Sequence, residues 1–152
     1  MRGKSVRRRG RETMLALAIE KMTICEWHGS AITECVVSFP AWEDVEAAVR
    51  ALDNSSFNDV YLHPSAADLG TYLCIGGGAG RYVVTGSISN EVFQTFLDPD
   101  LPPDPQEALV VGGQEGLYAH NWVHNLEDAL CATRAFYLAG SFETTDIAWT
   151  GI

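Results

Sequence analysis

The chain has 152 residues, a length that suits one domain with a hydrophobic core, and its 47% of apolar residues excludes wholesale disorder. Acidic residues outnumber Lys and Arg by 20 to 10, which gives a formal net charge of −10. No apolar run approaches the ~20 residues of a membrane-spanning helix, and the short apolar stretch after residue 13 does not fit a secretory signal. We therefore expect a cytoplasmic protein that binds no membrane.

The charges divide the chain into two regions. Six of the ten basic residues lie in the first twelve positions, which predicts a disordered basic tail over residues 1–13. A translation start at Met14 is the alternative interpretation of this tail. From Thr13 onward four basic residues stand against nineteen acidic ones, a net charge of −15 on a single predicted domain over residues 14–152. Such a body repels nucleic acid and attracts a basic protein partner, although an acidic surface also serves solubility alone.

The first elements are predicted strands followed by a helix. Residues 15–27 predict a strand or hairpin, and residues 32–37 predict a second strand. Pro40 suits the first turn of a helix, where its missing N–H costs nothing, and Asp53-Asn54 would end that helix. The apolar stripe of the helix consists of Trp42, Val45, Val49 and Leu52.

The middle of the chain is predicted to consist of short strands and turns. The glycine run at residues 76–80 predicts a hairpin turn that needs positive φ angles. The acidic, proline-rich segment 98–105 predicts an irregular loop. Strands are predicted at residues 60–62, 71–75, 81–86, 92–97, 107–111 and 116–118.

The last part of the chain contains a second helix with clear end signals. Asn125 is the predicted N-cap, Gly140 is the predicted left-handed C-cap, and a closing strand at residues 146–149 follows. This order of elements predicts an α+β fold, a mostly antiparallel sheet with two helices packed against one face. The buried face of the second helix is predicted to hold Leu126, Ala129, Leu130, Thr133, Phe136 and Tyr137.

Motifs of catalysis and cofactor binding do not fit this sequence. The glycine run is followed by strand-like Arg81-Tyr82 rather than by Lys-Ser/Thr and a helix, so it is not a phosphate loop. His120 and His124 have the i, i+4 spacing of a zinc helix, but Asn121 replaces the glutamate of such hydrolases. The GxSxG elbow and the zinc-deaminase signature are absent from the sequence. We therefore expect no catalytic residue, no cofactor and no metal ligand.

Cysteine and tryptophan are interpreted mainly as core residues. The cysteines form no CxxC pair, which favours small buried residues over disulfides. Trp42 and Trp149 are predicted core anchors, whereas Trp122, in a loop between two histidines, is a predicted interface residue. The four cysteines are Cys25, Cys35, Cys74 and Cys131.

A set of sequence features follows in order along the chain. It consists of a helix that opens with Trp42-Glu43-Asp44-Val45, the run Ile75-Gly76-Gly77-Gly78-Ala79-Gly80-Arg81-Tyr82, the turn Val111-Gly112-Gly113-Gln114, a second helix ending in Ala135-Phe136 and Gly140, and a closing Ile147-Ala148-Trp149. With these features in this order, the chain resembles the immunity proteins of bacterial polymorphic-toxin systems. The resemblance covers Leu15 to the C-terminus. The chain most resembles the family numbered one, which is often paired with deaminase toxins.

The resemblance implies a protein that binds its cognate toxin domain and occludes the toxin's active site, with no chemistry of its own. A toxin that acts on nucleic acid presents a basic cleft, for which a body at −15 can compete. The acidic loop is the predicted contact surface, because its prolines lower the ordering cost of binding. An ordinary solvated connector is the alternative. The predicted contact residues are Asp98, Asp100, Asp104, Glu107, Glu115 and Trp122.

Two other classes of function stay open at this point. The chain could be an adaptor or structural module, which would not need a toxin gene as its neighbour. It could also bind a small molecule, or act as an unfamiliar enzyme, through the region of His120, Trp122 and His124. Metal analysis and a ligand-induced melting shift would distinguish the last of these.

Overall fold

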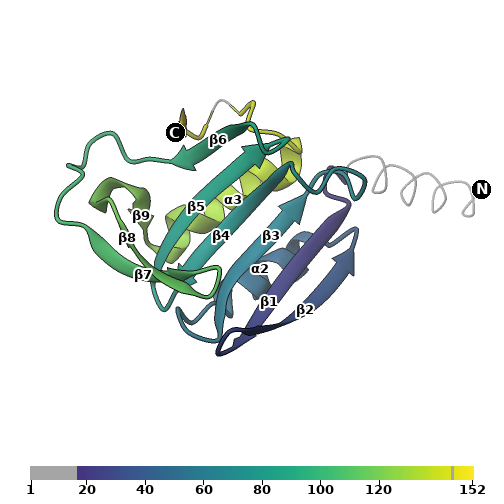
Figure 1. Ribbon diagram of the computed structural model, residues 1–152. Helices are drawn as coiled ribbons and strands as arrows, with labels where there is room; N and C mark the ends of the chain where they lie inside the picture. Colours follow the sequence, from purple (N-terminus) through teal and green to yellow (C-terminus); the bar gives the residue numbers. More distant parts are fainter. Residues whose placement is uncertain (1–16, 145) are drawn as a thin grey trace, which may run out of the picture.

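The strands that the structure describes all pair in antiparallel fashion, mostly as successive hairpins. The computed structural model describes residues 17–144 and 146–152. Seven strands lie side by side in the order β10-β6-β5-β4-β3-β1-β2, β9 pairs with β5, and β7 and β8 form a separate two-stranded sheet (Figure 1). The strands are β1 (Lys21–His28), β2 (Ala31–Ser38), β3 (Phe57–His63), β4 (Tyr72–Gly78), β5 (Arg81–Ile88), β6 (Val92–Phe96), β7 (Glu107–Val111), β8 (Gln114–Tyr118), β9 (Val123–His124) and β10 (Trp149–Gly151).

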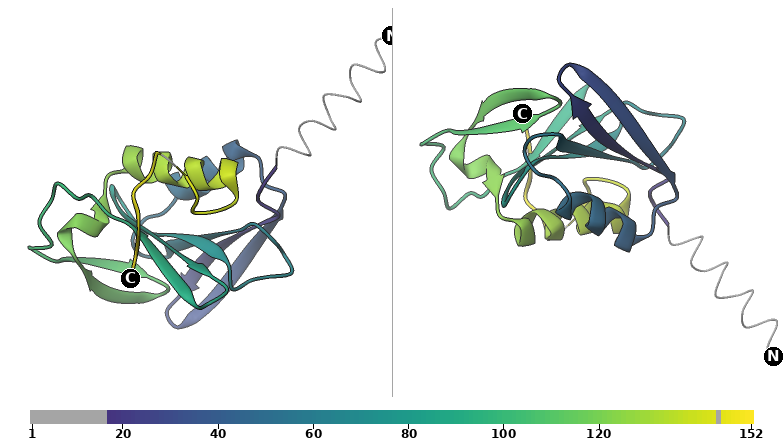
Figure 2. Two further views of the ribbon diagram at one scale, coloured as in Figure 1. Left: turned by 90° about the horizontal axis from the view of Figure 1, so that it is seen from above. Right: turned by 90° about the horizontal axis from the view of Figure 1, so that it is seen from below.

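The two α-helices of the described residues lie on one face of the large sheet (Figure 2). They are α2 (Trp42–Arg50) and α3 (Leu126–Ala139), and a short 3₁₀ helix, η1 (His120–Trp122), precedes β9. The predicted α+β fold, a mostly antiparallel sheet with two helices against it, is therefore confirmed. The predicted basic tail at residues 1–13 lies outside the described residues.

The ends of the helices follow local capping chemistry. The Asn125 side chain accepts a hydrogen bond from the Asp128 N–H at 2.8 Å, and Gly140 ends α3 with a φ of +67°. Both predicted caps are confirmed. Pro40 lies one residue before the N-cap of α2 rather than in its first turn. The free N–H of Ala41 at that cap is satisfied by the Asp44 carboxylate at 2.9 Å.

Several strand boundaries differ from the prediction because tertiary contacts decide them. β1 begins at Lys21 rather than at residue 15, and residues 15–16 lie outside the described part of the chain. β4 continues through Gly78, so only Ala79 and Gly80 form the turn, both with positive φ. The closing strand lies at Trp149–Gly151 rather than at residues 146–149, because these three residues pair with β6.

The hydrophobic core lies between the two helices and the sheet. Phe136 of α3 and Val49 of α2 are fully buried there, opposite Ile75 of β4. Trp42 and Trp149, the predicted core anchors, pack against this core but remain half-buried. The buried residues of α3 are Ala129, Ala132, Thr133, Phe136 and Tyr137, and the predicted Leu126 and Leu130 are half-buried beside them.

The β7–β8 hairpin covers part of the opposite face of the sheet (Figures 1 and 2). Leu109 of this hairpin is buried, and a Cβ atom on Gly76 of β4 would meet the Val111 side chain at 2.6 Å. Asn58, fully buried, accepts a hydrogen bond from the Gly113 N–H at 3.1 Å at the hairpin tip. The glycine in β4 therefore allows the hairpin to lie close against the sheet, and the rest of that face stays open.

Candidate functional site

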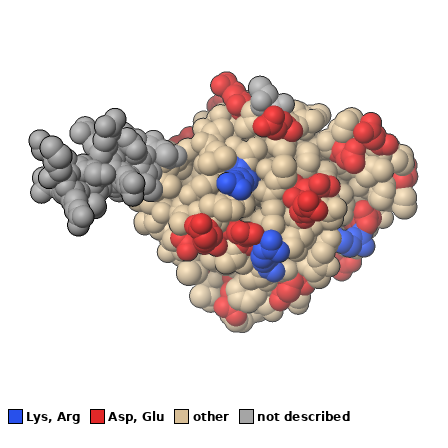
Figure 3. Space-filling model, turned by 180° about the vertical axis from the view of Figure 1, so that it is seen from behind, with Lys and Arg blue, Asp and Glu red and all other residues tan. Residues whose placement is uncertain are grey.

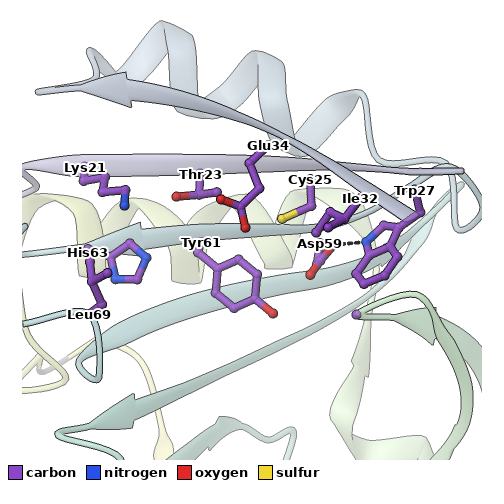
Figure 4. A pocket seen from close by; sticks show the side chains of 11 residues that line it. Lys21, Thr23, Cys25, Trp27, Ile32, Glu34, Asp59, Tyr61, His63 and Leu69 are labelled. Carbon is purple, nitrogen blue, oxygen red and sulfur yellow. Dashed lines mark hydrogen bonds between the residues drawn. The ribbon is translucent and has the colours of Figure 1, made fainter. Parts of the chain in front are cut away.

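A groove of about 390 Å³ lies on this open face (Figure 4). Side chains alternate between the two faces of a strand, so every second residue of β1 and β3 points into the groove while Met22 and Leu62 enter the core. Glu34 of β2 and Gly112 of the hairpin tip also line the groove. The strand residues along its floor are Lys21, Thr23, Cys25 and Trp27 of β1, with Asp59, Tyr61 and His63 of β3.

A buried carboxylate lies at one end of the groove. Asp59 is 1% exposed, and its Oδ1 accepts a hydrogen bond from the Trp27 indole N–H at 2.9 Å. Among the described residues, no Lys, Arg or His nitrogen lies within ion-pair distance of this carboxylate. Burial of a charge without a cation is costly. The end of the groove therefore carries negative potential that the described residues do not neutralise.

The groups around Asp59 are kept in their neutral forms. Burial, followed by the nearby Asp59 charge, raises the pKa of the Cys25 thiol to about 12. Burial also raises the pKa of the Cys74 thiol to about 12. Beside them, the Cys74 sulfur, burial and Asp59 together raise the pKa of the Tyr61 hydroxyl. At neutral pH these groups hold their protons, so they surround the carboxylate with neutral polar atoms.

The other end of the groove has a different electrostatic character. Figure 4 shows Lys21 and His63 there, away from Trp27 and Asp59. Burial lowers the pKa of His63, and the neighbouring Lys21 charge lowers it further. The imidazole is therefore neutral at pH 7, and Lys21 is the one cationic side chain among those that line the groove.

The four thiols fall into two classes, and all four are free. The prediction of buried cysteines holds for Cys25 and Cys74 but is wrong for Cys35 and Cys131, which are exposed. Cys35 is exposed because it lies on the sheet's outermost strand, β2, and Cys131 because it lies on the solvent side of α3. Only Cys35 and Cys131 are therefore accessible to thiol reagents in the folded protein.

The acidic loop predicted as the contact surface lies beside η1. The Asp98 N–H donates to the Asn121 carbonyl at 2.8 Å, and the His120 N–H donates to the Pro103 carbonyl at 2.8 Å. Asp98 is half-buried and its carboxylate accepts the Asp100 N–H at 3.0 Å, whereas Asp100 and Asp104 are exposed. The loop thus brings its carboxylates near the chain around η1, the segment that contains the half-buried Trp122.

The two glutamates predicted with this loop have different surroundings. Glu107 is in an ion pair with Arg81, and its second oxygen lies 3.2 Å from the His120 ring Nδ1. That carboxylate serves the internal structure. Glu115 is exposed on β8, where it pairs with Val110 of β7 rather than with a residue of the acidic loop.

In the region of His120, Trp122 and His124, the two imidazole rings contact different residues. His120 contacts Glu107, whereas the His124 ring Nε2 lies 2.8 Å from the Phe96 carbonyl oxygen and its ring stacks on Phe96 with centroids 4.0 Å apart. Within residues 17–144 and 146–152, no group of three or more His, Cys, Asp or Glu side chains is placed to hold a metal ion.

Sequence reasoning missed the groove, although a signal was present. In β3 the apolar Val60 and Leu62 alternate with Asp59, Tyr61 and His63, a period of two that marks a strand with one apolar and one polar face. The pattern indicates a polar face but not which other strand shares it. The pairing of Cys25 with Asp59 across β1 and β3 comes from the sheet register.

Comparison of the chain with protein-family models, curated proteins and solved structures finds no match to any of them. The resemblance to immunity proteins therefore stays a prediction. Neither α-helix of the described part has the length and apolar character needed to cross a membrane.

Proposed function

We propose that this protein is a cytoplasmic immunity protein that binds a basic, nucleic-acid-targeting bacterial toxin of the deaminase type and occludes its active site. The observation that carries the proposal is the charge of the described residues, nineteen acidic against four basic. Two of the four basic residues, Arg50 and Arg81, are already paired with glutamates. The described part of the chain therefore offers a basic partner a strong field with few competing cations.

The distribution of the charge supports a protein partner with a broad contact surface. Seen from behind, the acidic side chains are spread over the whole face and outnumber the basic ones (Figure 3). Such a spread attracts a basic protein from many directions and speeds the encounter. The open groove adds a local feature, because the exposed Glu34 carboxylate gives a cationic side chain of the partner a place to bind, and the buried Asp59 adds to the negative potential there.

The thiol chemistry of the groove supports binding rather than nucleophilic catalysis. The thiolate is the reactive form of cysteine, and thiols with a pKa of about 12 are protonated at neutral pH. Cys25 and Cys74 therefore serve as small neutral neighbours of Asp59. Neither thiol is therefore poised for nucleophilic attack at neutral pH.

The proposal is tested by co-purifying the tagged protein with the product of the adjacent upstream gene. We expect a tight complex that abolishes the toxicity of that product and weakens steeply as salt is added, because exposed charges are screened. Glu34→Lys in the groove should weaken the complex, and Glu91→Lys in the β5–β6 turn is the control with the same change of charge. No complex, together with a neighbour that is not toxic, would contradict the proposal and favour an adaptor.

The acidic loop is tested in the same assay as the second contact surface. Asp98 holds the loop's own turn, so the informative reversal is Asp100→Lys with Asp104→Lys, at two exposed positions. We expect weaker toxin binding with an almost unchanged melting temperature. Unaltered affinity would remove this loop from the interface.

A further inference from the structure

The edge of the sheet at β2 is unusually open. Among residues 17–144 and 146–152, β2 pairs with β1 alone and is the last strand of the sheet (Figure 1). Seven of its eight residues are exposed, it contains no Lys, Arg or Pro, and Glu34 is its one charged residue. The opposite edge, β10, has only three residues. Natural sheets usually protect long edges with charges, prolines or short strands, and β2 has little of this protection.

The register identifies which amide groups of β2 point outward. His28 and Ala31 flank the two-residue turn between β1 and β2. At this position the N–H of each residue points across to the other strand. The main-chain N–H of Trp27, the neighbour of His28, donates to the Ser56 carbonyl at 2.7 Å, on the side away from β2. This agrees with the alternation of N–H directions along a strand. The N–H groups that face outward from β2 therefore belong to Ile32, Glu34, Val36 and Ser38.

The two sides of β2 differ in chemistry. On the groove side, Glu34 pairs with Cys25 of β1, which in turn pairs with Asp59 of β3, so β1 lies between the two carboxylates. On the helix side, an apolar hollow of about 350 Å³ lies between β1, β2 and α2. Its apolar lining includes Met22, Ile24, Val37, Ala47, Ala48 and Phe57. A strand added beside β2 would meet Glu34, between the exposed Ile32 and Val36, with one set of alternate side chains. With the other set it would face the apolar hollow.

We propose that β2 pairs with an extended segment of the partner, in which Lys or Arg alternates with apolar residues. Main-chain hydrogen bonds to the open edge would supply affinity, and the two different sides of β2 would select the sequence. A second copy of this chain is a poor occupant, because each described body carries −15 and the copies repel. The basic character of the segment rests on the proposed function, whereas the strand pairing rests on β2 itself.

The inference is tested with a synthetic probe, an acetylated and amidated octapeptide of alternating Lys and Val, and with its Glu-Val counterpart. Titration is followed in the ¹H–¹⁵N NMR spectrum of the full chain. We expect the Lys-Val peptide to shift the amide signals of Ile32, Glu34 and Val36 and to slow their hydrogen exchange. The Glu-Val peptide should leave these signals unchanged.

Two variants of one residue separate strand pairing from other modes of binding. Val36→Pro removes an outward N–H, whereas Val36→Thr keeps it along with the β-branched shape. We expect Val36→Pro to weaken the Lys-Val peptide at least about tenfold, because one edge hydrogen bond is lost and the proline ring blocks the approach. Val36→Thr should change the affinity less than about twofold. Thermal unfolding of both variants checks that the sheet is intact.

Three outcomes would overturn the inference. They are shifts of the wild-type spectrum confined to other surfaces, equal binding by the Val36→Pro variant, and a dimer of the wild-type chain in sedimentation that Val36→Pro dissociates. The last would make a second copy the occupant of the edge. Peptide pairing at β2 without neutralisation of a toxin would refute the immunity role alone. If the wild-type chain neutralises the toxin and the Val36→Pro variant binds that toxin equally well, strand pairing alone would be refuted.

Discussion

Replacement of Trp27 by Phe should show how strongly the groove depends on the buried carboxylate. The change removes the indole N–H that donates to Asp59 at 2.9 Å and leaves an aromatic ring in its place. A hydrogen bond to a charged group contributes about 1.5–3 kcal/mol, and the smaller ring leaves unfilled space on the side of Gly113, where an added Cβ would meet the Trp27 ring. We expect a loss of about 2–3 kcal/mol, which for a chain of this length lowers the melting temperature by about 4–12 °C.

The matching measurement is a double-mutant cycle in urea with Asp59→Asn. The asparagine carbonyl still accepts from Trp27, but the bond becomes neutral and contributes only about 0.5–1.5 kcal/mol. Trp27→Phe should therefore cost about 1 kcal/mol less in the Asp59→Asn background than in the wild type. Equal costs in the two backgrounds, or a wild-type cost under about 0.5 kcal/mol, would refute the assignment of a charged hydrogen bond here.

Three further predictions concern pH, packing and thiol reactivity. Burial lowers the pKa of His63 in the folded protein from its ordinary 6.5, so the folded state favours the neutral imidazole. The contribution of His63 to the free energy of unfolding is therefore complete above pH 6.5. It is lost as the pH falls below 6.5, at up to about 1.4 kcal/mol per pH unit. Comparison of urea midpoints at pH 7.5 and 5.5 should show a smaller decline for His63→Gln. Phe136→Ala, at a fully buried site, should cost about 3–5 kcal/mol in urea unfolding, whereas Leu138→Ala, 61% exposed, should stay within about 0.5 kcal/mol. Iodoacetamide at pH 8 should alkylate the two exposed thiols and, until denaturant is added, spare the two buried ones, as mass spectrometry would detect.

The features that were predictable from the sequence are those that a short segment decides by itself. Asn125 and Gly140 bound α3 as expected, because the cap bonds involve residues only a few positions apart. The glycine run was correctly placed at a hairpin, but three of its members, Gly76, Gly77 and Gly78, lie in β4. A Cβ on Gly76 would meet Val111, and a Cβ on Gly78 would meet the backbone of Leu52. Those contacts are distant in sequence, and no local pattern reveals them.

The groove could not be assembled from the sequence for a similar reason. Its residues come from three strands, and their meeting depends on the register that pairs Cys25 with Glu34 on one side and with Asp59 on the other. The acidic loop was recognised because its composition is concentrated in eight consecutive positions. Composition alone gives no account of the bonds that Asp98 makes to its own loop. Concentrated charge is therefore easier to predict than a site built across strands.

Two features that do not favour the stability of the isolated protein occur at the same end of the sheet. Asp59 is buried without a cation among the described residues, and β2 leaves a long edge with little protection. A buried charge and an open edge each carry a cost, in desolvation for the first and in the risk of wrong association for the second. A basic strand beside β2 would relieve the second cost directly, because it would satisfy the edge amides, and it would bring positive charge to Glu34 on the groove side of β2. The acidic loop has no comparable unmet requirement, since Asp98 bonds within the loop and Glu107 pairs with Arg81. We therefore expect the β1–β2 end of the sheet to dominate the affinity for a partner and the loop to contribute mainly to the rate of encounter.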